Sequence, residues 1–306
     1  MTPMTPDWQA DYEALTTTCG VVPLTNWTQV QLTGKDRVSF LHNMCTNDIR
    51  RIEPGQSCEA FCTDVKGKIL AHVLVIAEAD RLQLLAVPGQ AERIIKHLDR
   101  YIIREDVQLA DLTADCVWNY AVGPRAADVS VTADLVVSCD WLWPNGFLVR
   151  TVKTENRPFE GLPIVDTSSP AWTALRVESG WPLYGTDFGE SHLPQEIDRN
   201  ARAISFTKGC YLGQETIARI DALGHVNKKL ALVKFAGETV PTVGTKIMSG
   251  EQEVGTITTS TWSPQFAAPA AIAFLRRGAN DLGTKLQTEL GAAEVVPPLI
   301  ARVNAT

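Results

Sequence analysis

The chain has 306 residues, of which 45% are hydrophobic and 21% are charged, and its formal net charge is −7. These values exclude a disordered protein, a fibrous protein and a small disulfide scaffold, and at about 150 residues per domain the length predicts two domains. No run of basic residues is longer than a pair, so we predict no direct contact with nucleic acid.

Hydrophobic periodicity in the first 112 residues predicts an α+β region. The predicted elements are, in chain order, a strand at 27–32, a helix from Asp36 to Asn47, hairpin strands at 58–61 and 69–77, a strand at 82–87, an amphipathic helix with Ile94, Ile95, Leu98 and Ile102 on its apolar face, and a strand at 107–112. Residues 64–67 form the turn of the hairpin. This order is typical of helices that cover one face of an antiparallel sheet.

The rest of the chain predicts further strands and two helices before the composition changes. The predicted elements are β structure over 117–165, a helix from Pro170 to Gly180, a short strand at 204–206, a loop at 208–213, and a helix that buries Ile217, Ile220 and Leu223 and ends at Gly224. From residue 230 onward, short β-rich runs alternate with glycine and proline turns, which predicts a small barrel or sandwich. We therefore predict two regions, 1–227 and 228–306.

Neither a membrane span nor a targeting segment is predicted. The longest apolar run, residues 69–77, is far shorter than the ~20 residues that cross a bilayer, and residues 1–14 lack a signal or transit pattern. The seven cysteines are odd in number and include no C-x-x-C pair. We therefore predict a reduced, cytoplasmic protein that contacts no membrane. The five histidines are too dispersed to predict a metal site.

The segment KGCYLGQE, residues 208–215, is the strongest candidate for chemistry. Gly209 and Gly213 permit unusual backbone angles around Cys210. Lys208 and the positive end of the following helix both favour a thiolate at this cysteine. The residue types leave a second interpretation open, because most free cysteines are buried packing residues and the segment also suits a strand-to-helix turn.

This segment resembles the KGCYxGQE signature of the YgfZ-type folate-binding proteins. They form a branch of the YgfZ/GcvT family, with the glycine-cleavage T-protein (aminomethyltransferase) and a mitochondrial iron–sulfur assembly factor as relatives. Other blocks are similar to that family too, and the residues that carry the resemblance there are Gly34, Asp36, Phe40, Leu41, Thr46, Asn47, Asp48, Arg176, Glu178, Gly180, Pro182, Pro194, Gln195, Glu196, Val254 and Gly255. The resemblance covers essentially the whole chain. It implies a three-lobed, ring-like T-protein fold with two interwoven α+β lobes and a carboxy-terminal β-barrel.

The resemblance also implies that tetrahydrofolate, or a derivative of it, binds in a channel between the lobes. In relatives the glutamate of the R-x-E-x-G block binds the pterin edge, and that position is Glu178 here. A carboxylate suits this role because it accepts two parallel N–H bonds. Two folate-binding tryptophans of bacterial members fall on Trp27 and Trp172, whose flat rings suit stacking. The alternatives are a solvated Glu178 and ordinary core packing of the tryptophans.

The function that the resemblance implies is a folate-binding accessory protein in iron–sulfur cluster assembly or repair. Such a protein supports cluster-dependent tRNA-modifying enzymes indirectly, through transient contacts with iron–sulfur assembly proteins or with the enzymes themselves. Cys210 is then the active thiol and Lys208 promotes its thiolate. The other residues implied to shape this loop are Gly209, Tyr211, Gly213, Gln214, Glu215 and Arg219. Because a cluster usually needs about four ligands, one thiol holds a cluster only together with a partner.

The hairpin departs from the aminomethyltransferase branch. Where that branch has two aspartates, this chain has Leu70 and Ala71, so no carboxylate is present there for acid–base chemistry. Asp64, before them, is predicted to be a turn residue. A tetrahydrofolate-dependent aminomethyltransferase, or another one-carbon transferase or demethylase, is the alternative function. A scaffold that has kept the fold and lost the ligand is the third.

Overall fold

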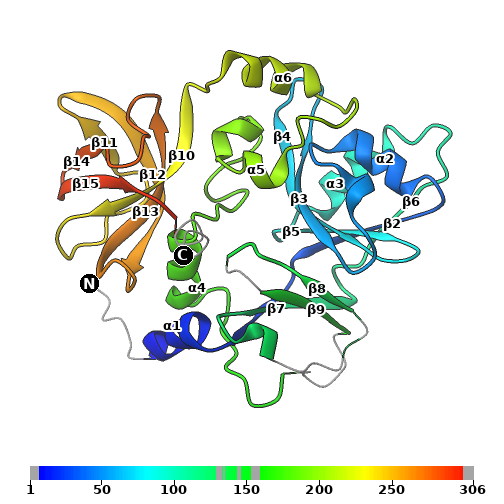
Figure 1. The fold of residues 1–306 in the computed structure, drawn as a ribbon, viewed down its shortest axis with the longest axis horizontal. Helices are drawn as coiled ribbons and strands as arrows, with labels where there is room; N and C mark the ends of the chain where they lie inside the picture. The colour runs from blue at the N-terminus through cyan, green and yellow to red at the C-terminus, as the bar shows by residue number, and fades with distance from the viewer. Residues whose placement is uncertain (1–6, 129–132, 134, 143–145, 153–158, 299–306) are drawn as a thin grey trace.

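The computed structural model describes residues 7–128, 133, 135–142, 146–152 and 159–298. Figure 1 shows three lobes: a five-stranded sheet with its helices on the right, a four-stranded sheet below, and a closed barrel on the left. The described part of the segment that connects the four-stranded sheet to the barrel carries α4 (Pro170–Glu178), η3 (Pro194–Ile197), α5 (Asn200–Ala203) and α6 (Gln214–Leu223). This segment lies between the lobes and along the top of the view (Figure 1).

The first lobe is a sheet with the strand order β3-β4-β5-β2-β6. Its elements are β2 (Thr28–Thr33), α2 (Arg37–Met44), η1 (Ile49–Arg51), β3 (Ser57–Thr63), β4 (Ile69–Ala77), β5 (Leu82–Ala86), α3 (Ala91–Asp99) and β6 (Gln108–Asp111). Strand β4 is buried on both faces. Val73 and Val75 pack with α2 and α3, whereas Leu74 and Ile76 belong to a second core shared with the next lobe. This is why β4 is apolar apart from His72 and does not alternate with polar residues.

The second lobe is a sheet with the strand order β1-β7-β9-β8. Its elements are α1 (Asp7–Thr17), β1 (Gly20–Leu24), β7 (Cys116–Val122), η2 (Ala126–Asp128), β8 (Val136–Ser138) and β9 (Phe147–Val152). Strand β1 precedes the first lobe in the chain, and β7 to β9 follow it. The two lobes are therefore interwoven in sequence, as the resemblance implied.

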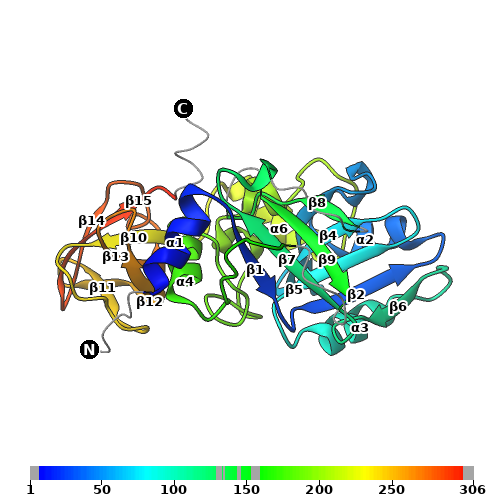
Figure 2. The same cartoon turned by 90° about the horizontal axis from the view of Figure 1, so that it is seen from below.

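The third lobe is a closed barrel, so the sequence-based choice between barrel and sandwich is settled. Its strands are β10 (Lys228–Phe235), β11 (Lys246–Ser249), β12 (Gln252–Ser263), β13 (Ala268–Arg276), β14 (Lys285–Thr288) and β15 (Gly291–Val296). Along β13, Ala271 and Ala273 fill the barrel core, while Ala270 and Ile272 pack outward in a cluster with Ile217 of α6. Helices α1 and α4 lie side by side next to this lobe (Figures 1 and 2), so the barrel closes against both other parts of the chain.

Several local expectations differ from the structure. The helix predicted to end at Asn47 ends at Met44, and Ile220, predicted to be buried, is half-buried. Residues 204–206 form no strand; Ser205 N instead donates to the Thr46 carbonyl oxygen at 3.0 Å, which ties this segment to the end of α2. Leu223 is 62% exposed in the last turn of α6, because that end of the helix projects beyond the packed core. Asp36 precedes α2 as expected, but its carboxylate accepts from the Asp106 amide at 2.8 Å and does not cap the helix.

In the described ranges, no helix is long and apolar enough to cross a membrane.

Candidate functional site

Cys210 lies in the segment between α5 and α6 and is exposed to solvent. The six other cysteines are less accessible: Cys58 and Cys116 are half-buried, and Cys19, Cys45, Cys62 and Cys139 are buried. Cys210 is therefore not a core packing residue. Its thiol is open to reagents and to partner proteins.

Lys208 holds the loop in place through its side chain. The ammonium group donates to the carbonyl oxygens of His42, Cys45 and Asn47, with distances of 2.8 Å to the last two. These oxygens lie at and just beyond the end of α2, where a helix leaves its carbonyl groups without helical partners. Burial lowers the pKa of Lys208, whose side chain also lies against the Tyr211 ring.

The prediction that Lys208 promotes the Cys210 thiolate is not tested by these contacts, which show where the ammonium group is held. A lysine ammonium has three N–H donors, and backbone carbonyls take all three. No donor is left for the sulfur atom. Lys208 therefore positions the loop. Its ammonium group lies at the carboxy-terminal end of α2, where the helix dipole is negative.

The remaining residues of the loop are held by backbone contacts. Leu212 N donates to the Asn43 carbonyl oxygen at 2.9 Å, and Thr63 Oγ1 donates to the Leu212 carbonyl oxygen at 2.7 Å. Tyr211 is buried in the cluster that joins α6 to the barrel. Cys210 is thus fixed between two anchors, the side chain of Lys208 and the backbone of Leu212.

Of the two glycines in the loop, only Gly213 needs to be glycine for steric reasons. Its φ is +81°, and a Cβ at this position would lie 2.4 Å from the Asp64 carbonyl oxygen. Gly209 has no such neighbour and no positive φ. Asp64 is a turn residue, as predicted, since its Oδ1 accepts from the amides of Lys66 and Lys68 at 2.8 Å. The hairpin turn and the loop therefore pack backbone to backbone.

Cys210 borders an open pocket at the surface. We call it the Cys210 pocket, and the residues that line it are His42, Asn43, Met44, Arg50, Gly209, Cys210, Tyr211 and Leu212. The other predicted loop residues lie outside this set: Gln214 is half-buried at the start of α6, and Glu215 and Arg219 are exposed on that helix. The contribution of α2 and η1 to the pocket was not visible in the sequence.

Glu178 is the last residue of α4 and is completely buried. Pro170 occupies the first turn of this helix, as the sequence predicted, and Ser169 caps it, which was not predicted. Three donors reach the carboxylate: the Tyr12 hydroxyl at 2.6 Å, the Ser263 hydroxyl, and the Gln265 amide at 3.2 Å. Burial raises the pKa of Glu178 above its ordinary value.

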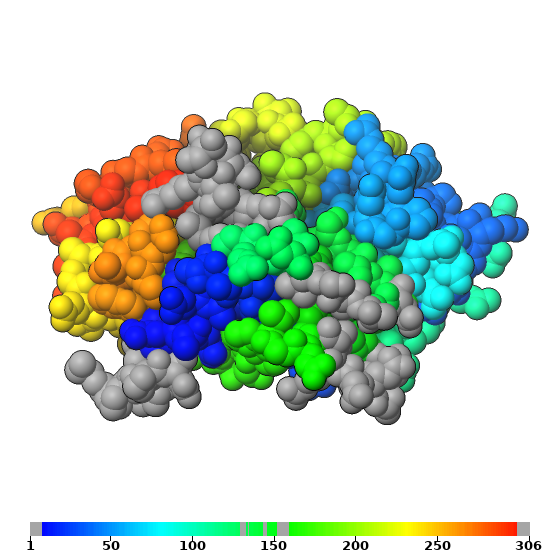
Figure 3. Space-filling view, turned by 60° about the horizontal axis from the view of Figure 1, so that its bottom comes forward, coloured from blue at the N-terminus to red at the C-terminus, as the bar shows by residue number. Residues whose placement is uncertain are grey.

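The partners of Glu178 come from opposite ends of the chain. Tyr12 is on α1 and Ser263 ends strand β12 of the barrel. Figure 3 shows α1, in blue, at the surface beside the orange barrel strands. The alternative of a solvated glutamate is therefore wrong.

Trp27 and Trp172 belong to one group of four tryptophans, which we call the indole stack: Trp27, Trp141, Trp172 and Trp181. Trp181 contacts the other three. Its ring centroid lies 4.9 Å from that of Trp141 and 6.0 Å from that of Trp27, both nearly parallel, and Trp172 meets it edge-on at 6.2 Å. The sequence identified two of these four rings, and the resemblance gave no reason to include Trp141 or Trp181.

The residue types of this region suit a pterin, but their arrangement is closed. A planar ring between two others needs about twice the ~3.5 Å contact distance between carbon atoms, which is more than the spacing inside the stack. The cavity that Trp27, Trp141 and Trp181 border has a volume of about 10 Å³. That is room for about one water molecule. Tetrahydrofolate does not fit these residues in the conformation described.

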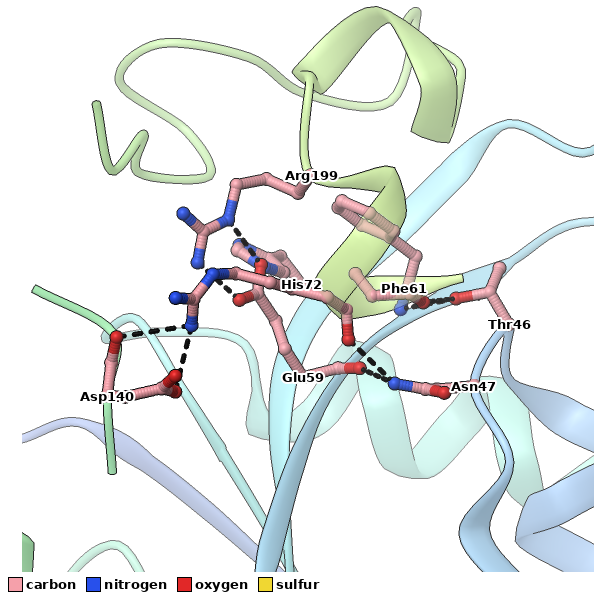
Figure 4. Close-up of polar contacts among 9 residues, drawn as sticks. Thr46, Asn47, Glu59, Phe61, His72, Asp140 and Arg199 are labelled. Atoms are coloured by element: carbon pink, nitrogen blue, oxygen red, sulfur yellow. Dashed lines mark hydrogen bonds and ion pairs between the residues drawn. The ribbon is translucent and has the colours of Figure 1, made fainter. Parts of the chain in front are cut away.

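A buried charge cluster that the sequence did not reveal lies between β3, β4 and α5 (Figure 4). Glu59 accepts from Arg199 Nε at 2.8 Å and from a second guanidinium nitrogen, and its Oε1 lies 2.7 Å from His72 Nε2. His72 also stacks on Phe61, with ring centroids 4.7 Å apart. This cluster joins the first lobe to the connecting segment.

Within the described residues, no group of three His, Cys, Asp or Glu side chains is arranged to hold a metal ion.

At the hairpin, the residues that stand in the place of two aspartates offer no acid. Leu70 is half-buried and Ala71 is buried in β4. Ala71 pairs with Cys62 of β3, which is also buried. The geometry of the hairpin thus provides no carboxylate for proton transfer at these two positions.

Comparisons with known proteins agree with this architecture. The GCVT N-terminal domain matches residues 1–140, and the glycine cleavage T-protein C-terminal barrel domain matches residues 228–300. The tRNA-modifying protein YgfZ of Hamiltonella defensa is 30% identical over 246 residues, which cover 73% of this chain and 72% of that protein. The aminomethyltransferase of Nostoc sp. is 23% identical, covering 92% of this chain and 83% of that protein.

A solved structure shows the same fold. Aminomethyltransferase T of the glycine cleavage system from Bartonella henselae superimposes with a TM-score of 0.80 at 17% identity, over 95% of this chain and 88% of that one. The two domain matches, the 30% identical relative and this superposition agree along the chain. The chain therefore belongs to the YgfZ/GcvT family of glycine-cleavage T-protein-like proteins.

Proposed function

We propose that this chain is a YgfZ-type accessory protein that supports the assembly or repair of iron–sulfur clusters through Cys210. The observation that carries the proposal is the exposed thiol in a loop fixed on both sides, by Lys208 and by Leu212. Relatives at 27–30% identity that bear the name tRNA-modifying protein YgfZ support the link to tRNA modification. Cluster-dependent tRNA-modifying enzymes are then the beneficiaries, and the site of action is the reducing cytoplasm.

The chemistry of one thiol defines the kind of partner. Iron–sulfur clusters are usually held by about four thiolate ligands. In the described part of the chain, Cys210 is the one exposed cysteine, so further ligands must come from another molecule. The proposed partners are iron–sulfur assembly proteins or cluster-dependent enzymes, in transient contact with this loop.

The test is complementation in a strain that lacks the gene for this protein. We expect Cys210→Ser to lose the cluster-dependent modification of tRNA, measured by mass spectrometry of tRNA nucleosides. Cys116→Ser is the matched control, since that cysteine is half-buried in β7 and lies outside the Cys210 pocket. Full restoration by Cys210→Ser would remove the thiol from the function.

Tetrahydrofolate, or a derivative, is the proposed small-molecule ligand at Glu178 and the indole stack. Because this region is closed, the proposal requires the rings to separate and the Tyr12 and Ser263 hydroxyls to release the carboxylate when the ligand enters. The test is an anaerobic calorimetric titration of tetrahydrofolate into the wild type and Glu178→Gln. We expect saturable binding that weakens at least tenfold in the variant, the loss typical of a removed charge-assisted pair. Absence of binding to the folded wild type would refute this ligand and leave the proposal for Cys210 intact.

An aminomethyltransferase or other one-carbon transferase is the second candidate, favoured by the fold and by relatives with that name. The hairpin disfavours this activity, since Leu70 and Ala71 replace the acids that the transfer chemistry needs. We expect no turnover of aminomethyl or methylamine donors in the presence of tetrahydrofolate. Turnover above the uncatalysed rate would establish the second candidate.

A further inference from the structure

The Cys210 pocket has a charged group that the proposed function does not use. Arg50, from η1, borders the pocket together with Cys210 and is exposed. Its neighbour Arg51 is paired, with Nε 2.8 Å from Asp48 Oδ2. Among the ion pairs and side-chain hydrogen bonds of the described residues, none involves the Arg50 guanidinium. Arg50 thus brings an uncompensated positive charge to the edge of the pocket.

The other charges near the pocket are already engaged. The Lys208 ammonium is surrounded by three carbonyl oxygens. Besides its pair with Arg51, Asp48 accepts from the Arg50 backbone amide at 3.2 Å. Arg50 is therefore the charged residue in the lining of the pocket, although the whole chain has a net charge of −7. The local charge is positive on a molecule that repels anions overall.

A buried imidazole adds a second polar group to the lining. His42 is 3% exposed, and burial, together with the charge of Lys208, lowers the pKa of this histidine. Its Nδ1 lies 3.3 Å from Asp48 Oδ1. The ring thus adds a polar group, placed beside Asp48, to the lining of the pocket.

We propose that the Cys210 pocket binds a small molecule that carries a carboxylate, and that Arg50 holds the carboxylate beside the Cys210 thiol. A guanidinium suits this task because its planar fork matches the two oxygens of a carboxylate. The proposal rests on the proposed function only in treating Cys210 as the working thiol. It adds the class of ligand and the residue that selects it.

Two alkylating reagents of nearly equal size test this proposal. Iodoacetate and iodoacetamide react in the same way: the sulfur atom forms a bond to the CH₂ carbon, and iodide leaves with the electron pair of the broken C–I bond. Iodoacetate carries a carboxylate, whereas iodoacetamide carries a neutral amide at the same position. The rate ratio of the two reagents at Cys210, measured on the peptide that contains it, therefore cancels changes in the reactivity of the thiol itself.

We expect the ratio of iodoacetate to iodoacetamide rates at low salt to be about fivefold higher in the folded protein than in urea, the size of one partly exposed charge contact. Arg50→Gln should return the ratio to the value in urea. Arg51→Gln is the matched control, because it removes the same charge from the adjacent residue, whose partner is Asp48. Arg50→Lys keeps the charge without the fork and should retain part of the preference.

Two results would overturn the inference: a ratio in the folded wild type no higher than in urea, or an equal fall in Arg50→Gln and Arg51→Gln, which indicates a diffuse field. Arg50 is exposed, so its replacement leaves the core intact, and circular dichroism checks this. The outcome is separate from the complementation test. If Cys210→Ser fully restores tRNA modification in cells while the rate ratio behaves as expected, the proposed function fails and the carboxylate site stands. If Cys210→Ser loses tRNA modification while the rate ratio is no higher than in urea, the carboxylate site alone is refuted.

Discussion

The Lys208 ammonium lies 2.8 Å from the carbonyl oxygen of Cys45, so a buried positive charge ties the cysteine-bearing loop to the end of α2. The two residues are 163 positions apart in the sequence, and their contact joins the connecting segment to the first lobe. The lysine of the KGCYLGQE segment thus has a structural role, which is to hold the loop against the end of α2. The charge compensates a helix terminus and leaves the cysteine free at the surface.

Removing this charge should loosen the loop. In Lys208→Met, three buried carbonyl oxygens lose their donor, and we expect the free energy of unfolding to fall by about 3 kcal/mol in urea titrations. Proteolytic cleavage within residues 205–213 should become faster as well. Lys66→Met, at an exposed turn position, should change stability by less than ~0.5 kcal/mol. Equal stability of the two variants would contradict the role of Lys208 as an anchor.

The contact between the hairpin turn and the loop makes a prediction for Gly213. Gly213 and Gly224 both have positive φ, at +81° and +72°, so alanine costs about 1 kcal/mol at either site through backbone strain. At Gly213 the added Cβ also meets the Asp64 carbonyl oxygen at 2.4 Å, whereas at Gly224 nothing lies within 4 Å. We therefore expect Gly213→Ala to be the more destabilising by at least ~1 kcal/mol. Thermal unfolding of the two variants measures this difference, and equal melting temperatures would refute the close approach.

The elements that the sequence predicted well have signals that are local. Strand β4 matches the predicted range 69–77, and α4 begins at the predicted Pro170, because a run that is apolar apart from His72 and a proline at a helix start need no distant information. The range 204–206 was misassigned for the opposite reason. Its backbone partner is Thr46, far away in the chain, and no pattern of neighbouring residues indicates that contact.

The same limit explains which parts of the candidate site were found. Glu178 and Cys210 stand in recognisable segments, but the groups that define their surroundings come from elsewhere. Tyr12 reaches Glu178 across 166 positions of the sequence. Arg50 borders the Cys210 pocket from the first lobe. Tertiary packing alone brings such residues together, so the sequence indicated Glu178 and Cys210 as candidates, which stay predictions, and did not indicate the residues that surround them.

The indole stack should be visible in solution. Trp181 lies nearly parallel to Trp141 and Trp27, and coupling between such close rings gives a split signal in far-ultraviolet circular dichroism. We expect Trp181→Phe to weaken this signal strongly, since the substitution removes the contacts of Trp181 with the other three rings and leaves only the pair Trp27–Trp141, whose centroids are 6.0 Å apart. Trp118→Phe is the control, because Trp118 is also buried but lies outside the stack.

The same signal reports on ligand entry. If tetrahydrofolate separates the rings, saturating ligand should weaken the split signal of the wild type. Binding seen by calorimetry with an unchanged signal would show that the ligand occupies another place and that the stack stays closed.

The Glu59–Arg199 pair predicts how stability depends on pH. Burial alone would raise the pKa of Glu59, but the charge and hydrogen bonds of Arg199, with a hydrogen bond from His72, outweigh it and hold the pKa well below its ordinary value of 4.5. A carboxylate with a lowered pKa in the folded state stabilises the protein above the unfolded-state value and loses this contribution as the pH falls. The wild type should therefore lose stability between about pH 5 and pH 3.

Glu59→Gln isolates this contribution. At pH 7 the variant leaves Arg199 buried without its carboxylate, and we expect a loss of about 3–5 kcal/mol in the free energy of unfolding. Because the variant has no proton to gain at this position, its stability should fall less steeply with decreasing pH than that of the wild type. Glu190→Gln, which breaks an exposed pair with Arg93, should cost less than ~1 kcal/mol and keep the pH dependence of the wild type. Urea unfolding of the three proteins from pH 7 to pH 3 decides the matter, since parallel curves for the wild type and Glu59→Gln would show that the pKa of Glu59 is not lowered by folding.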